Sequence, residues 1–163
     1  MSKQKTNEKF TTTEHDNYIS IHCPKVTYYL NNCFIPFGMN DNYTMKLEFT
    51  QHNIDIFESI KKKEKDFFNN AKYILHKDHS IESPRLNSKL QKKGRYPPTI
   101  LCSVYQRNNT IQSILKQKAR KLNTFYTLQR KRVNAQIECD TIWFNKKSQG
   151  MNCYWKINYV EVI

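Results

Sequence analysis

Hydrophobic and polar side chains alternate most regularly between residues 43 and 50. The apolar positions there are Tyr43, Met45, Leu47 and Phe49. Because successive side chains of a strand point to opposite faces of the sheet, this spacing predicts a β-strand with one buried face. The preceding residues, Gly-Met-Asn-Asp-Asn at 38–42, have the composition of a turn.

The next segment has a helical period. Its apolar side chains recur every three or four positions, at Ile54, Phe57, Ile60, Phe67, Phe68, Ala71, Ile74 and Leu75. This spacing predicts one long amphipathic helix over about residues 53–75, with Asn53 as its N-cap. Lysines interleaved with Glu64 and Asp66 in the middle of this segment indicate an ordinary solvated face.

The remaining apolar segments are short. Residues 18–21, 26–30 and 33–37 predict three short or edge strands, because Pro24 and Pro36 restrict pairing. Further strands are expected over 100–104, from 133 to 144, and over 153–163, with a hairpin loop at 145–150 in which Gly150 takes a positive φ. The pattern at 111–122 fits either a short basic helix or another strand.

Two polar stretches complete the organisation. Residues 1–17 predict a flexible N-terminal arm, and residues 76–98 predict a long basic loop. Strands, one long helix, a loop and more strands then make up a single domain over 18–163. The fold class expected is α+β or mostly β, with one helix packed on a bent antiparallel sheet or small barrel.

The distribution of charge along the chain indicates what kind of partner the protein binds. The chain has 163 residues and a formal net charge of +13. Residues 83–137 contain no Asp or Glu but contain 13 of the 27 Lys and Arg residues, while the other 14 match the 14 acidic residues in number. Such a field of one sign repels itself, so it indicates a polyanionic partner, most commonly nucleic acid.

Aromatic residues interleave with this basic segment. Single strands are held by cations on phosphates and by rings stacked on bases, a combination that favours single-stranded nucleic acid but does not separate DNA from RNA. The candidate phosphate contacts are Arg107, Lys116, Lys118, Arg120, Lys121, Arg130, Lys131 and Arg132. The candidate stacking residues are Tyr105, Phe125, Tyr126 and Trp143, although core packing is an equal alternative for several of these rings.

Motifs for catalysis, metals and cofactors are missing from the sequence. No Gly-rich phosphate loop, nucleophile elbow or zinc-ligand spacing occurs, so we expect neither a cofactor nor a metal, and no enzyme activity. The five cysteines are scattered, which indicates reduced, buried thiols. No signal peptide or apolar run of membrane-spanning length is seen, and we expect an intracellular protein, in host cytoplasm or nucleus if viral, that is neither secreted nor bound to membrane. The oligomeric state is left open.

Four segments together resemble the OB-fold single-stranded DNA-binding proteins of large DNA viruses, including those of poxvirus and asfarvirus type. They are the strand at Tyr43–Phe49, the helix at Ile54–Leu75, the stretch Tyr96-Pro97-Pro98-Thr99-Ile100, and the closing hairpin from Ile142 through Gly150 to Ile157. The resemblance implies a single OB-like barrel. It also implies a viral protein that coats single-stranded DNA during replication or recombination.

Two other functions compete with DNA coating. The basic face suits a viral accessory or structural protein that docks an acidic protein partner. The only acid–histidine cluster, His76, Asp78, His79 and Glu82, suits a metal-dependent nuclease. Binding, docking and cleavage predict different partners, so each can be tested separately.

Overall fold

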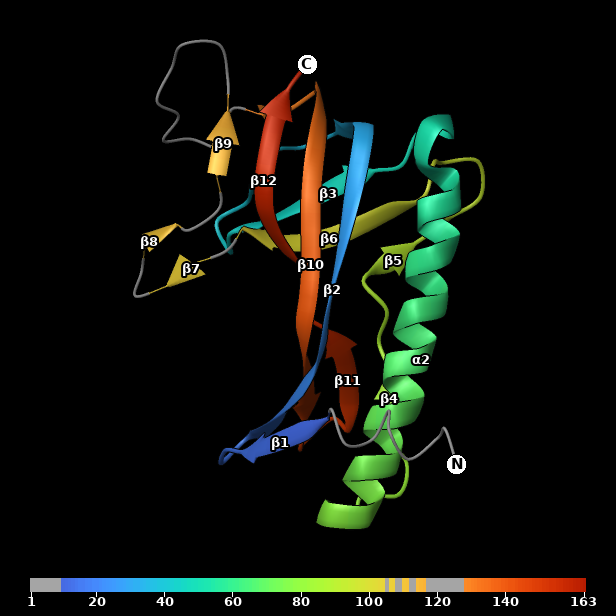
Figure 1. Cartoon of the computed structure of the whole chain (residues 1–163), viewed down its shortest axis with the longest axis vertical. Helices are drawn as coiled ribbons and strands as arrows, with labels where there is room; N and C mark the ends of the chain where they lie inside the picture. Colours follow the sequence, from blue (N-terminus) through green and yellow to red (C-terminus); the bar gives the residue numbers. More distant parts are fainter. Residues whose placement is uncertain (1–9, 105, 108–109, 112–113, 117–127) are drawn as a thin grey trace. The chain divides into compact units, whose positions relative to one another are not determined.

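The computed structural model describes residues 10–104, 106–107, 110–111, 114–116 and 128–163 (Figure 1). The chain divides into two compact units, which we call unit 1 and unit 2. Unit 1 comprises Met1–Val26, Ile60–Ser88 and Cys139–Tyr154, and unit 2 comprises Thr27–Ser59, Lys89–Glu138 and Trp155–Ile163. Strand β2 (Tyr18–Ile35), helix α2 (Ile54–His79) and strand β10 (Lys131–Asn145) have residues in both. The single domain expected over 18–163 stays a prediction.

Unit 2 is built on a mixed sheet. Hydrogen-bonded neighbours follow the order β2, β3 (Thr44–Glu48), β6 (Thr99–Val104), β12 (Lys156–Val162) and β10, and β2 also pairs with β10. Neighbours along this order are antiparallel, except that β6 and β12 are parallel. Strand β5 (Leu90–Gln91) pairs with β6, β9 (Ile114–Lys116) pairs with β12, and β7 (Gln106–Arg107) pairs with β8 (Thr110–Ile111).

The strand expected at 43–50 is confirmed as β3. Met45 and Leu47 are buried, and their partners across the antiparallel ladder, Cys102 and Ile100 of β6, are buried too. The strand begins one residue later than the alternation suggests, because Tyr43 has a φ of 58° and an exposed ring. One face of β3 therefore belongs to the core and the other faces solvent.

The three short strands expected between residues 18 and 37 are corrected to one strand, β2, of 18 residues. Pro24 lies within it. The pairing with β1 ends at His22, so Pro24 lies beyond that ladder and its missing N–H is not required there. Pro36 directly follows the last residue of the strand, where no ladder hydrogen bond from its nitrogen is needed.

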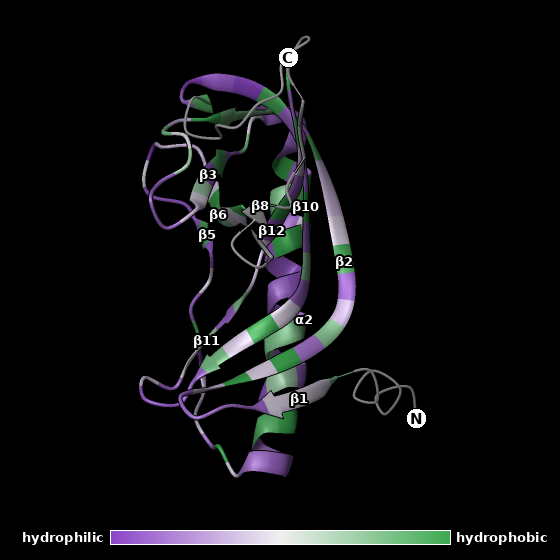
Figure 2. Cartoon of the chain, turned by 90° about the vertical axis from the view of Figure 1, so that its left-hand side faces the viewer, coloured by the Kyte–Doolittle hydropathy of each residue, from purple (hydrophilic) through white to green (hydrophobic). Residues whose placement is uncertain are grey.

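Helix α2 confirms the helix expected over about 53–75 and continues to His79. Its hydrophobic and hydrophilic bands alternate along its length (Figure 2). Asn53 is not its N-cap but lies in a preceding 3-10 turn, η1 (Gln51–Asn53). The Asn53 side chain is buried, accepts a 2.7 Å hydrogen bond from the Thr50 N–H and donates one of 2.8 Å to the Asn31 carbonyl. The amide thus joins the helix start to β2.

Glu64 corrects the expectation of a uniformly solvated lysine-rich face. This carboxylate is 2% exposed and accepts a 2.5 Å hydrogen bond from the Ser88 hydroxyl. Position 64 lies four residues after Ile60 and seven before Ala71, both fully buried, so the helical period itself places Glu64 on the apolar face. Its charge does not lie among the exposed lysines.

The described residues of unit 1 contain three short strand pairings. Strand β1 (Thr11–Glu14) is antiparallel to the first part of β2. The last part of β10 is antiparallel to β11 (Gly150–Cys153), which is parallel to β4 (Arg85–Leu86). Phe10 is buried and meets the Phe67 ring edge-on at 6.0 Å. Within the expected flexible arm, residues 10–14 therefore have a packed ring and a strand, while residues 1–9 lie outside the described part.

Several loops also differ from expectation. The long loop expected over 76–98 contains the end of α2 and the short strands β4 and β5. The hairpin loop at 145–150 is present, but the positive φ, 61°, belongs to Gln149 and not to Gly150. The last expected strand is two strands, β11 and β12. The segment 111–122 includes β9, and residues 117–122 lie outside the described part.

The described residues contain a mostly β fold with one long helix, which confirms the α+β class. All five cysteines are buried thiols outside any disulfide, as expected. Within these residues, no helix combines the length and the apolar composition needed to cross a bilayer.

Candidate nucleic-acid interface

A row of side chains crosses the solvent-facing side of the unit 2 sheet. Glu48 of β3 lies opposite Phe34 of β2 and opposite Thr99 of β6, and Thr99 lies opposite Gln91 of β5. Directly opposed residues project from the same face of a sheet. Phe34, Glu48, Thr99 and Gln91 therefore form one row across four strands.

The hairpin between β5 and β6 presents an aromatic ring beside this row. Lys92 Nζ donates hydrogen bonds to the carbonyls of Gly94 at 2.5 Å and of Tyr96 at 2.8 Å. The Tyr96 N–H donates to the Lys93 carbonyl at 3.1 Å, and Gly94 takes a φ of 53°. The Tyr96 side chain, 77% exposed, projects from this tight turn. The local hydrogen bonds hold an apolar ring in solvent.

A second exposed ring follows β2. Phe37 is 69% exposed, and the next residue, Gly38, has a φ of 74°, a conformation that glycine adopts without strain. Further along the loop, the Asn40 side-chain oxygen accepts hydrogen bonds of 3.0 Å from the N–H groups of Asn42 and Thr44. This Asx-type turn fixes the path from β2 into β3.

Between the two rings lies a groove with a cavity volume of about 250 Å³. Its walls and floor come from the β2–β3 loop, β3, β5, the β5–β6 hairpin and β6. The lining residues are Pro36, Phe37, Lys46, Glu48, Gln91, Lys93, Tyr96, Pro97 and Thr99. Exposed rings can stack on bases and lysine ammoniums can contact phosphates, so the groove combines the two interactions that hold a single strand.

Three of the predicted phosphate contacts lie at one end of the row. Arg130, Lys131 and Arg132 are exposed. The Arg130 N–H donates a 2.6 Å hydrogen bond to the Ile35 carbonyl, directly before Pro36 of the groove. The Arg132 guanidinium carbon lies 5.9 Å from the centroid of the Phe34 ring, within cation–π range. The structure thus brings this basic cluster next to the groove.

The other predicted contacts cannot be placed at the side-chain level. Arg107 lies in β7 and Lys116 in β9, whose backbones alone are described; Lys116 is the register partner of Glu161 in β12. The remaining predicted residues lie outside the described part of the chain, namely Tyr105, Lys118, Arg120, Lys121, Phe125 and Tyr126. Their roles stay predictions.

Trp143, the fourth predicted stacking residue, belongs to unit 1. Its half-buried ring lies 5.1 Å from the Tyr18 ring and 5.9 Å from the Tyr154 ring, measured between centroids. These contacts correspond to the packing alternative weighed for this ring. A base-stacking role for Trp143 also stays a prediction.

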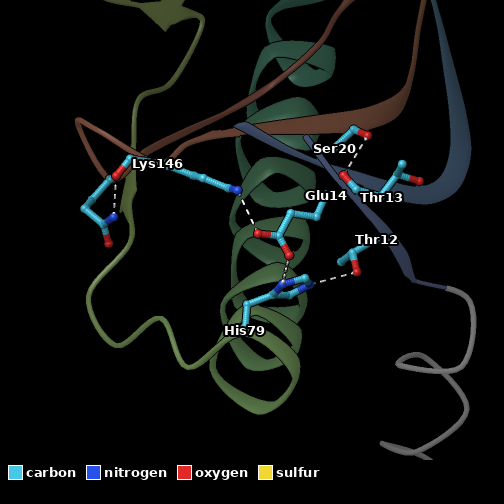
Figure 3. Close-up of polar contacts among 7 residues, drawn as sticks. Thr12, Thr13, Glu14, Ser20, His79 and Lys146 are labelled. Atoms are coloured by element: carbon cyan, nitrogen blue, oxygen red, sulfur yellow. Dashed lines mark hydrogen bonds and ion pairs between the residues drawn. The ribbon is translucent and has the colours of Figure 1, made fainter. Parts of the chain in front are cut away.

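One member of the acid–histidine cluster, His79, contacts β1 (Figure 3). His79 Nε2 lies 2.9 Å from the Thr12 hydroxyl, and His79 Nδ1 lies 3.5 Å from a Glu14 carboxylate oxygen. Lys146 Nζ donates a 2.7 Å hydrogen bond to the other Glu14 oxygen, and this contact lowers the pKa of Glu14. In the described part of the chain, no three His, Cys, Asp or Glu side chains gather as a metal site would require.

Several groove residues were not among the predicted contacts, notably Phe37, Lys46 and Tyr96. A usable signal exists for the two rings. Phe37 lies between Pro36 and Gly38, and Tyr96 precedes Pro97 and Pro98. Turn residues around a large ring argue against a core position, because turns lie at the surface. Lys46 carries no comparable signal, because every half-buried strand has outward polar positions.

Comparison with known proteins gives an informative likeness among solved structures. No protein-family model matches the chain. No curated protein matches it either. Among solved structures, the chain is similar to gp2.5, a single-stranded DNA-binding protein encoded by bacteriophage T7, with a TM-score of 0.61 and 9% sequence identity over 85% of this chain and 86% of that one. At this identity the likeness shows a shared fold.

Proposed function

We propose that this protein binds single-stranded DNA in the groove of unit 2, without catalysing a reaction. The observation that carries the proposal is the pair of exposed rings, Phe37 and Tyr96, on a groove lined by Lys46 and Lys93. Large rings held in solvent cost free energy unless a ligand covers them, and base–ring stacking contributes about 1–3 kcal/mol per base.

The strand order supports an OB-like barrel as the frame of this site. Five strands follow one another as β2, β3, β6, β12 and β10, and the pairing of β10 with β2 returns to the first. An OB-fold is a five-stranded barrel that binds oligonucleotides on the face of its second and third strands. Here β3 and β6 would take these places, and both contribute to the groove. The phage T7 protein with the similar fold is itself a single-stranded DNA-binding protein.

Within this proposal, phosphates contact the basic residues around the groove. Lys93 lines it, and Arg130, Lys131 and Arg132 extend its charge past Phe34. The predicted contacts outside the described residues stay part of the proposal. The role that we propose is that of a viral-type protein. It coats single strands during replication or recombination and prefers DNA over RNA.

The decisive experiment is a fluorescence-anisotropy titration with labelled oligo-dT, repeated at several salt concentrations with duplex DNA and RNA as competitors. We expect single strands to outcompete duplex, with log affinity falling by about 0.7 per unit of log salt for each phosphate contacted. The double variant Phe37→Ala/Tyr96→Ala should bind at least about tenfold more weakly, because two stacking platforms are lost.

Unchanged affinity of this double variant would remove the groove from the proposal. Equal binding of every polyanion would reduce the basic residues to a charged surface. In that case the acidic protein partner weighed above becomes the better explanation, and it predicts saturable binding to a protein.

A further inference from the structure

One carboxylate stands among the cations of the groove. The residues that line the groove include Lys46, Lys93 and a single acidic side chain, Glu48. The facing wall comes from residues 91–99, within the segment that contains no Asp or Glu. A carboxylate repels phosphates, so its presence in a phosphate-binding groove requires another explanation.

The Glu48 carboxylate is not occupied by contacts within the protein. Among the described residues it has no ion pair and no side-chain hydrogen bond. It lies on the outward face of β3, opposite to the buried Leu47, and is half-buried. A half-buried carboxylate without a partner is available to a ligand that donates hydrogen bonds.

Bases differ in what they offer such an acceptor. Guanine presents two neighbouring donors on its Watson–Crick edge, N1–H and the N2 amino group, which match the two oxygens of a carboxylate. Cytosine, adenine and thymine present one donor each on that edge, and a phosphate presents none. A carboxylate therefore selects guanine among the ligands that a single strand brings.

A neighbour of Glu48 in the row, Thr99, offers a donor to the remaining acceptor on the guanine edge. Thr99 is the cross-strand partner of Glu48, and such neighbours lie about 5 Å apart. On guanine the acceptor O6 follows N1–H along the same edge, at the place where the Thr99 hydroxyl can donate. A base stacked against Tyr96 or Phe37 would turn this edge to the row of Glu48 and Thr99.

We propose that Glu48 makes the groove prefer guanine, by accepting hydrogen bonds from N1–H and the N2 amino group of a stacked base. The inference rests on the proposed function, because it assumes that bases enter the groove. It assigns the bases to the floor of the groove and the phosphates to its basic rim.

The test compares oligonucleotides that differ in one amino group. Anisotropy competition uses alternating thymine–guanine and thymine–hypoxanthine strands of equal length, because hypoxanthine lacks only the N2 amino group. The wild-type protein should prefer guanine by at least about tenfold, as expected for one hydrogen bond to a charged acceptor. In Glu48→Gln this ratio should fall, because the neutral amide oxygen is a weaker acceptor than a carboxylate. The affinity for oligo-dT should not decrease, because a repelling charge is removed.

Glu58→Gln is the matched control. Glu58 is exposed on α2 within unit 2 and does not line the groove, so its removal changes the net charge equally and should leave the guanine preference intact. A wild-type ratio of one, or a preference that is unchanged in Glu48→Gln, would overturn the inference. Failure of the proposed function has a different signature, since oligo-dT would then bind the Phe37→Ala/Tyr96→Ala variant as tightly as the wild type.

Discussion

The Arg132 guanidinium lies over the Phe34 ring, and Phe34 is the cross-strand partner of Glu48. This contact joins the start of β10 to the row of side chains that crosses β2, β3, β6 and β5. A guanidinium in cation–π contact with a ring keeps its N–H donors in its own plane, where they can still bind other groups. The contact thus places a cation at the end of the proposed binding row.

Removing this basic cluster should weaken binding without changing sequence preference. In Arg130→Gln/Lys131→Gln/Arg132→Gln, we expect a loss of affinity that is similar for all oligonucleotides, and a salt slope shallower by about 2, because up to three phosphate contacts disappear. Anisotropy titrations at several salt concentrations measure both. The charge-matched control is Lys61→Gln/Lys62→Gln/Lys65→Gln, three exposed lysines of α2. Equal losses in both triple variants would show that only total charge matters.

Trp143 can be tested by its own fluorescence. Trp155 is 1% exposed, whereas Trp143 is half-buried, so a bound strand should quench chiefly Trp143 if that ring stacks on a base. The stacking prediction requires quenching by oligo-dT that disappears in Trp143→Phe, together with weaker binding. Tight binding without quenching would mean that Trp143 only packs against Tyr18 and Tyr154.

The buried Glu64 should make Ser88 important for stability. Ser88→Ala removes a hydrogen bond to a carboxylate that is 2% exposed, and we expect the free energy of unfolding to fall by about 1–3 kcal/mol. Urea denaturation measures this change. Ser83→Ala, at an exposed position nearby in the sequence, should change stability little. A neutral Ser88→Ala would show that other groups satisfy the carboxylate.

The contact of Glu14 with Lys146 should be sensitive to acid. Its pKa lies below the ordinary value of 4.5, so the carboxylate is more acidic in the folded chain than in the unfolded one. Its contribution to stability is then present above that ordinary value and is lost as the pH falls through the lowered pKa. The stability difference between wild type and Lys146→Ala should therefore shrink as the pH falls from above 4.5 through the lowered pKa. Lys147→Ala, at the exposed neighbour, should show no such trend, and a difference that is constant with pH would contradict the assignment.

The elements that were predictable from sequence are those whose evidence is local. Three elements show their hydrophobic periodicity within one continuous stretch of sequence, namely β3, α2 and β10. Strand β2 was divided wrongly because the cost of Pro24 depends on which neighbour pairs there, and only the topology decides that. The run of charges around position 64 predicts a solvated face. The spacing of Glu64 from Ile60 and Ala71 instead predicts the buried face on which it lies.

The candidate site was predictable only in part. The acid-free segment contains the hairpin that presents Tyr96, and it contains Arg130, Lys131 and Arg132. The groove itself arises from register, which places Glu48 between Phe34 and Thr99, residues far apart in the chain. Periodicity within a strand identifies its outward face but not the neighbours across it, so Phe37 and Lys46 could not be joined to Tyr96 beforehand.

The continuity of β2, α2 and β10 limits how this protein can be taken apart. The chain passes from one unit to the other five times, and three of these passages lie inside regular elements. A linear fragment that retains all of either unit therefore also contains most of the other, and separating one unit alone would cut β2, α2 and β10. Deletion series are poorly suited to assigning activities here, whereas an insertion in the hairpin at 92–98 leaves every helix and strand whole.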